Sequence, residues 1–150
     1  MATQTTIHTT TELNFKNGKE VPVHRLPFVD TQPGKSGISF WNVPKTGGYS
    51  GGCKTGNALA LIYLKHLREY GCGDGGGSLQ TIAMDMFDSE GNDSPEHDAL
   101  RGQMVGFFSE LDRYLAGAVN CLTGDLDKYS NEKLLQEAID GLNSCIEGDR

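Results

Sequence analysis

The second half of the chain contains an apolar stripe with helical spacing that runs for more than six turns, and this stripe limits the folds open to the protein. Ser94 and Pro95 precede it and are typical of a helix start. The members of the stripe recur at intervals of three or four residues: Leu100, Met104, Phe107, Phe108, Leu111, Leu115, Ala118 and Leu122. The pattern predicts a long helix from Pro95 with one apolar face.

Three further segments have helical spacing. Apolar residues from Ala58 to Leu67 predict a helix that ends at Gly71, and residues 79–87 predict a short one after Ser78, although a strand is also compatible with that segment. The last helix is expected to begin at Ser130, a typical N-cap. We expect its apolar residues to be buried: Leu134, Leu135, Ala138, Ile139, Leu142 and Ile146.

Short segments before residue 44 alternate as strands do. Residues 13–15 and residues 21–23 lie on either side of Asn17-Gly18, a pair typical of tight turns. This arrangement predicts a β-hairpin in which Pro22 places the second strand at a sheet edge or in a bulge. Residues 38–43, "ISFWNV", predict another strand with Trp41 buried. Strands therefore precede helices. We expect an α+β fold in which a small antiparallel N-terminal sheet of about three to four strands packs against four C-terminal helices.

A chain of 150 residues is expected to form a single domain, 1–150. Residues 1–10 are polar and rich in threonine, so we expect them to fray, and residues 71–78 are predicted to be a flexible glycine-rich connector. The sequence has no apolar run of roughly 20 residues, the length a membrane span needs. Its first residues lack the basic and apolar parts of a secretory signal. These features predict a soluble, cytoplasmic protein without a membrane partner.

Charge is distributed unevenly along the chain. Residues 1–82 carry eight Lys and Arg against five Asp and Glu, whereas residues 83–150 carry five against fifteen. Acidic helices of this kind are often only solvated surfaces, but a split in charge also indicates two faces with different partners.

The segment "PKTGGYSGGCKTG", residues 44–56, lies between a predicted strand and a predicted helix. Its spacing does not fit a phosphate-binding loop of the GxxxxGK[ST] type. Two interpretations stay open: the glycines allow a tight crossing into the helix, with Thr55 or Asn57 as the N-cap, or their N–H groups bind an anion. The anion would be a nucleotide, a nucleic-acid phosphate or the carboxylate of a partner. The residues predicted to bind it are Gly47, Gly48, Tyr49, Gly51, Gly52, Lys54, Thr55, Trp41 and Lys45, with the ring of Tyr49 or of Trp41 stacking on a base.

Cys53 lies in the same segment. "GGCKTGNALALIYLKHLREYG" resembles the Gly-x-Cys helix of transglutaminase-like and papain-like cysteine enzymes. The resemblance implies a nucleophilic thiolate at Cys53, stabilised by the start of a helix. Such a nucleophile needs a histidine base, and the sequence places none beside it, because His66 belongs to the same predicted helix. The cysteine spacing does not fit a zinc site, and residues 85–93 lack the regular spacing of a calcium loop. We therefore expect neither a metal nor a cofactor.

These features predict a small, acidic, non-enzymatic binding protein with a glycine-rich anion-binding loop and a protein partner. In class, but not in sequence, it is similar to phage and mobile-element inhibitors of host systems. Two alternatives remain. One is a hydrolase or acyl transferase that uses Cys53, and the other is an oligomeric structural protein that forms a homodimer through the helix from Pro95.

Overall fold

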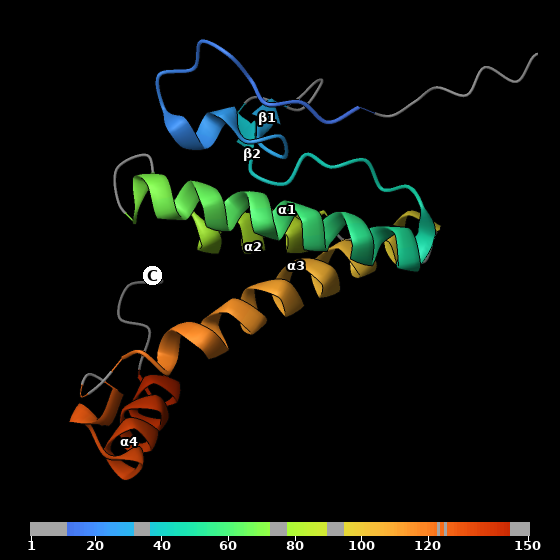
Figure 1. Ribbon diagram of the computed structural model, residues 1–150. Coiled ribbons are helices and arrows are strands. Elements are labelled where there is room, and N and C mark those ends of the chain that lie inside the picture. The colour runs from blue at the N-terminus through green and yellow to red at the C-terminus, as the bar shows by residue number, and fades with distance from the viewer. Residues whose placement is uncertain are drawn as a thin grey trace, which may run out of the picture. The chain divides into compact units, whose positions relative to one another are not determined.

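The computed structural model describes residues 12–31, 37–72, 78–89, 95–122, 124 and 126–144. The chain divides into two compact units, residues 1–113 and 114–150. In chain order its elements are the 3-10 helix η1 (Pro22–Arg25), strands β1 (Asp30–Thr31) and β2 (Ile38–Ser39), helices α1 (Gly48–Tyr70), α2 (Leu79–Asp88) and α3 (Pro95–Val119), the 3-10 helix η2 (Leu126–Lys128) and helix α4 (Asn131–Leu142) (Figure 1). Among these helices, none is both long and apolar enough to cross a membrane.

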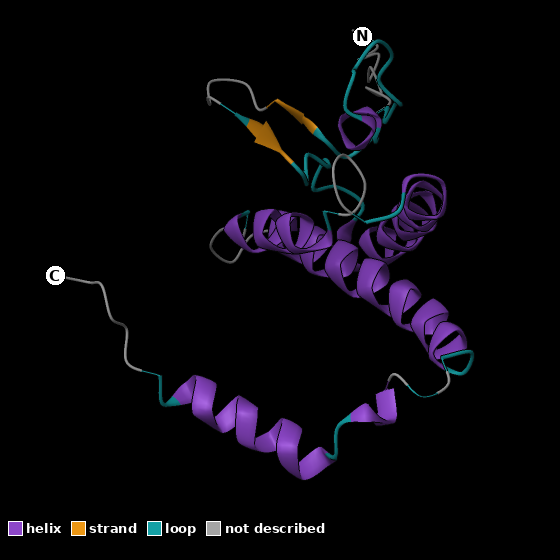
Figure 2. Cartoon of the chain, turned by 90° about the vertical axis from the view of Figure 1, so that its left-hand side faces the viewer, coloured by secondary structure: helices purple, strands orange, loops and turns teal. Residues whose placement is uncertain are grey.

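The α+β class is confirmed, but the sheet is smaller than predicted. It has two antiparallel strands, with Asp30 opposite Ser39 and Thr31 opposite Ile38 (Figure 2). The predicted hairpin around Asn17-Gly18 is wrong, because its second strand is replaced by η1. Pro22 lies at the start of η1, where its fixed φ suits a helical turn and its missing N–H is not needed. The predicted strand 38–43 ends after Ser39.

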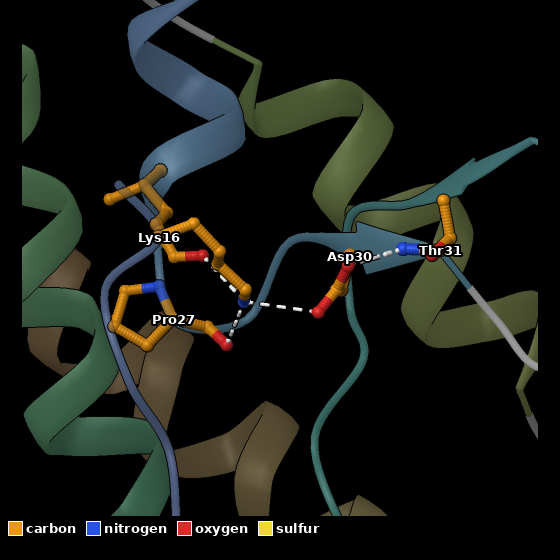
Figure 3. Close-up of polar contacts among 5 residues, drawn as sticks. Lys16, Pro27, Asp30 and Thr31 are labelled. Atoms are coloured by element: carbon orange, nitrogen blue, oxygen red, sulfur yellow. Dashed lines mark hydrogen bonds and ion pairs between the residues drawn. The ribbon is translucent and has the colours of Figure 1, made fainter. Parts of the chain in front are cut away.

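Polar contacts of Lys16 hold the N-terminal segment in place where the predicted strand pairing is missing. The Lys16 backbone N–H donates to the carbonyl of Arg25 at 2.9 Å. Its ammonium group donates to the carbonyl oxygens of Leu26 at 3.2 Å and Pro27 at 3.0 Å, and lies 3.7 Å from the carboxylate of Asp30 (Figure 3). One side chain therefore fastens residues 12–16 to the turn that follows η1.

The core of unit 1–113 combines the segments before α1 with helices α1, α2 and α3. Trp41 is buried, as predicted, and its ring lies 5.3 Å from that of Phe28 and 5.2 Å from that of Phe107. The other members come from all parts of the unit: Val23, Leu26, Val29, Val43, Leu59, Ala60, Tyr63, Ile82, Met86, Leu100 and Leu111. The core therefore lies between the N-terminal segments and the helices.

The helices predicted after residue 78 are confirmed in type. Residues 79–88 form helix α2 and not a strand, because Ile82 and Met86, four residues apart, share the buried face while Met84 and Phe87 are exposed. Helix α3 begins at Pro95 as predicted. Helix α4 follows Ser130, whose hydroxyl accepts a hydrogen bond from the Lys133 N–H at 3.3 Å, so the predicted N-cap is also confirmed.

The predicted burial of the last helix is wrong. All described residues from 114 to 144 are exposed, including the apolar residues of α4 between Leu134 and Leu142. Cys121, which follows α3, is exposed as well. Ile146 and Cys145 lie outside the described residues. Helical spacing indicates which residues share one face of a helix, but that face is buried only where another surface covers it.

Candidate functional site

Residues 48–56 of the glycine-rich segment are helical, so the predicted loop conformation is wrong for this part. Helix α1 begins at Gly48 with Gly47 as its N-cap, so the two predicted N-caps, Thr55 and Asn57, are wrong and lie inside the helix. The two glycines at the helix start have a positive φ, 87° at Gly47 and 63° at Gly48, a conformation that glycine adopts without strain. Gly51, Gly52 and Gly56 therefore belong to the first turns of a helix of 23 residues.

Two of these glycines lie against the backbone of α3. A Cβ on Gly52 would overlap the carbonyl oxygen of Ala99, and a Cβ on Gly56 would overlap that of Gln103. The relation is mutual, because a Cβ on Gly102 or Gly106 would overlap a carbonyl oxygen of α1. Glycine is required at these four positions because the two helices approach each other at backbone distance.

The spacing of these glycines is the sequence signal that the loop interpretation missed. Gly52 and Gly56 are four residues apart on α1, as are Gly102 and Gly106 on α3. Glycines separated by four residues share one helix face, and small residues on facing stripes allow close helix packing. The two glycine pairs taken together predict that the two helices cross at close distance. The first pair taken alone is typical of a flexible loop.

A buried glutamine supports the same crossing. The Gln103 side chain accepts a hydrogen bond from the Trp41 indole N–H at 3.1 Å and donates one to the Pro44 carbonyl at 2.9 Å. Trp41 is 2% exposed, so its ring has almost no surface on which a base could stack. Its interactions in the structure are those of a core residue that fixes the chain before α1.

The other residues predicted to bind an anion are distributed around the start of α1. The Lys45 ammonium donates to the Ser89 carbonyl at 2.6 Å, which ties this segment to the end of α2. Gly52 and Lys54 are two positions apart and hence roughly 200° apart around the helix. Gly52 contacts α3 and Lys54 is exposed. Gly47, Gly48 and Tyr49 are exposed, and Gly51 and Thr55 are partly buried. Anion binding by these residues stays a prediction.

Cys53 lies in the second turn of α1 and is partly buried. Its backbone carbonyl occupies the space that a Cβ on Gly106 would take, so this turn is part of the helix crossing. His66 is thirteen residues further along α1, about 20 Å at 1.5 Å per residue. The His66 ring instead packs beside Tyr70, with ring centres 4.8 Å apart. His66 therefore cannot act as a base for Cys53 in this structure.

Comparison with protein-family models, curated proteins and solved structures gives no match to the chain.

An exposed apolar surface lies on α4, where five apolar residues form what we call the α4 face: Leu134, Leu135, Ala138, Ile139 and Leu142. At 100° per residue they cover a sector of about 140°. In projection down the helix axis, Glu132 lies just beyond the edge of the sector marked by Ile139, and Glu137 lies beyond the edge marked by Leu134. The α4 face is therefore apolar with an acidic border on both sides.

Proposed function

We propose that this chain works by binding another protein, and that the α4 face is the binding surface. The observation that carries the proposal is its exposure: Leu135 is 62% exposed, Leu142 86% and Ile139 40%. Exposed apolar stripes with polar borders are typical of protein interaction sites. An amphipathic helix commonly binds its partner through such a stripe.

The charges beside the stripe favour a partner with basic residues. Helix α4 carries Glu132, Glu137 and Asp140 against a single cation, Lys133. The Lys133 ammonium lies 4.4 Å from the centre of the Tyr129 ring and is held there. A partner whose apolar face is bordered by Lys and Arg would pair with the two bordering glutamates, whereas a second copy of this chain would bring like charges together. We therefore propose an amphipathic segment with basic borders as the ligand of α4.

Two model peptides test this proposal. Both carry leucines with helical spacing, but one has lysines and the other glutamates at all remaining positions. We expect the lysine peptide to bind the full chain and its affinity to fall with added salt, because part of the attraction is electrostatic. The measurement is fluorescence anisotropy of the labelled peptides, with light scattering of the protein alone to determine its oligomeric state.

Two exposed apolar residues provide a matched pair of variants. Leu135→Glu introduces a charge into the α4 face, whereas Met84→Glu introduces the same charge at a residue of α2 with nearly equal exposure, 62% against 63%. A buried leucine contributes about 1.5–3 kcal/mol. We therefore expect Leu135→Glu to weaken binding at least about tenfold and Met84→Glu to leave it unchanged.

A charge exchange tests the acidic border separately. Replacing Glu132 and Glu137 by lysine should reverse the preference, so that the glutamate peptide binds more tightly than the lysine peptide. Equal effects of Leu135→Glu and Met84→Glu on the affinity would show that the peptide does not bind at the α4 face. A stable dimer at micromolar concentration that fails to bind the lysine peptide would identify a second copy as the occupant. Either result would overturn the proposal.

A further inference from the structure

A cavity of about 420 Å³ lies between α1 and the N-terminal segment, within unit 1–113. Its apolar wall includes Phe15, Leu26, Ile62 and Tyr70. Pockets that bind small molecules usually measure roughly 300–1,000 Å³ and combine apolar walls with a few polar groups. The size and the walls of this cavity are those of a site for a small, partly apolar molecule.

The outer wall of the cavity is fixed in position. Phe15 directly precedes Lys16, whose ammonium is bound to the carbonyls of Leu26 and Pro27 and lies near the carboxylate of Asp30 (Figure 3). Phe15 is 60% exposed, although it lines the cavity, so a ligand there would cover apolar surface that water now contacts. The backbone beside this wall is thus held in place by Lys16, which lowers the entropy lost on binding.

Charged groups reach the cavity from two sides. Arg25 lines it from η1, and its Nε–H donates to the Lys19 carbonyl at 2.8 Å, which orients the guanidinium. Lys65 lines it from α1 and is exposed, and Glu69 lies one turn further along the same helix. Arg25, Lys65 and Glu69 together give the polar side of the cavity a net positive charge. Arginine and lysine are the side chains that most readily bind carboxylates.

We propose that this cavity binds a small aromatic carboxylate, with its ring among Phe15, Ile62 and Tyr70 and its carboxylate between Arg25 and Lys65. The aromatic class follows from the two aromatic walls, since rings pack favourably against rings. The His66 ring stands beside that of Tyr70 and extends the same surface. The site involves none of the residues of α4, so it is independent of the proposed protein-binding surface.

Naphthoate is a suitable probe because it is a flat aromatic carboxylate that the cavity can hold. Naphthalenemethanol, which keeps the ring but lacks the charge, is the matched control ligand. Titrations followed by protein amide shifts should place naphthoate binding at Lys65 and Tyr70, and naphthoate should bind more tightly than the alcohol. Failure of naphthoate to bind up to millimolar concentration, or equal affinity for the alcohol, would overturn the proposal.

Three variants locate the site. Lys65→Ala should weaken naphthoate binding about fivefold, the effect of losing one partly exposed charge pair, and leave the alcohol unaffected. Ile62→Trp should fill the cavity and prevent both ligands from binding, with circular dichroism to verify that the helices are retained. Lys54→Ala removes the same charge from α1 outside the cavity and should change neither affinity. A loss in Lys54→Ala with none in Lys65→Ala would place the anion at the start of α1 and contradict the assignment.

Discussion

Replacing Gly56 by alanine would place a methyl group inside the crossing of α1 and α3. The new Cβ would overlap the Gln103 carbonyl and lie 2.7 Å from the Phe107 nitrogen, whereas Cβ contacts essentially never fall below 3.0 Å. Both obstructing atoms belong to the backbone of α3, so a change of side-chain rotamer cannot relieve the overlap. The two helices would have to separate, and their packing around Phe107, which is fully buried, would loosen.

The expected loss of stability follows from two opposing effects. Overpacking costs about 1–3 kcal/mol, and the upper end applies because backbone atoms are obstructed. Alanine gains about 1 kcal/mol over glycine in helix propensity. We therefore expect Gly56→Ala to lower the free energy of unfolding by about 2 kcal/mol, which corresponds to a fall in Tm of roughly 4–8 °C for a chain of this length.

Gly51 provides the control on the same helix. A Cβ there would have no atom of the described residues within 4 Å apart from its own helix backbone and chain neighbours, so Gly51→Ala should raise the free energy of unfolding by about 0.5–1 kcal/mol. Urea unfolding followed by circular dichroism and by fluorescence of Trp41, the single tryptophan, measures both variants. If Gly56→Ala were as stable as Gly51→Ala, the close crossing of the two helices would be refuted.

Two further predictions concern buried polar groups. Gln103→Leu leaves the Trp41 indole N–H and the Pro44 carbonyl without their partner, so we expect a loss of about 2–4 kcal/mol in urea unfolding; a loss below about 0.5 kcal/mol would contradict the role of these bonds. Burial raises the pKa of the Tyr63 hydroxyl, although a hydrogen bond from the Ser78 N–H opposes this shift. The resulting stabilisation is complete below the unfolded pKa of about 10 and is lost as pH rises through the folded pKa. The fall in stability across this alkaline range should be smaller in Tyr63→Phe than in the original chain, and parallel curves for the two proteins would exclude the effect.

Helix positions could be predicted from the sequence wherever the apolar spacing was continuous. Residues 79–88 are one example, because Ile82 and Met86 share the buried face of α2. The helix start at Pro95 is another, because Leu100 and Phe107 are both buried on α3. The predicted hairpin is wrong because a few alternating apolar and polar residues do not outweigh Pro22, which begins a 3-10 helix. Local patterns therefore predicted the long elements better than the short ones.

The candidate sites depended on contacts that a local pattern does not contain. Gly52 and Gly56 indicate a loop until they are paired with Gly102 and Gly106, some 50 residues away in the sequence. The apolar spacing of α4 was recognised, but spacing alone could not show that its face is exposed. The cavity beside α1 combines residues 15–26 with residues 62–70, and its walls exist only after these segments have packed together.

The helical state of residues 48–56 and their contact with α3 define the first part of α1. Solution NMR can measure both through the Cα chemical shifts of residues 48–56 and the nuclear Overhauser effects of the glycine α-protons. We predict helical shifts throughout this segment and a strong effect between an α-proton of Gly56 and the amide proton of Phe107, because that α-proton occupies the position of the absent Cβ. Random-coil shifts from 48 to 56, with no contact to α3, would contradict the account.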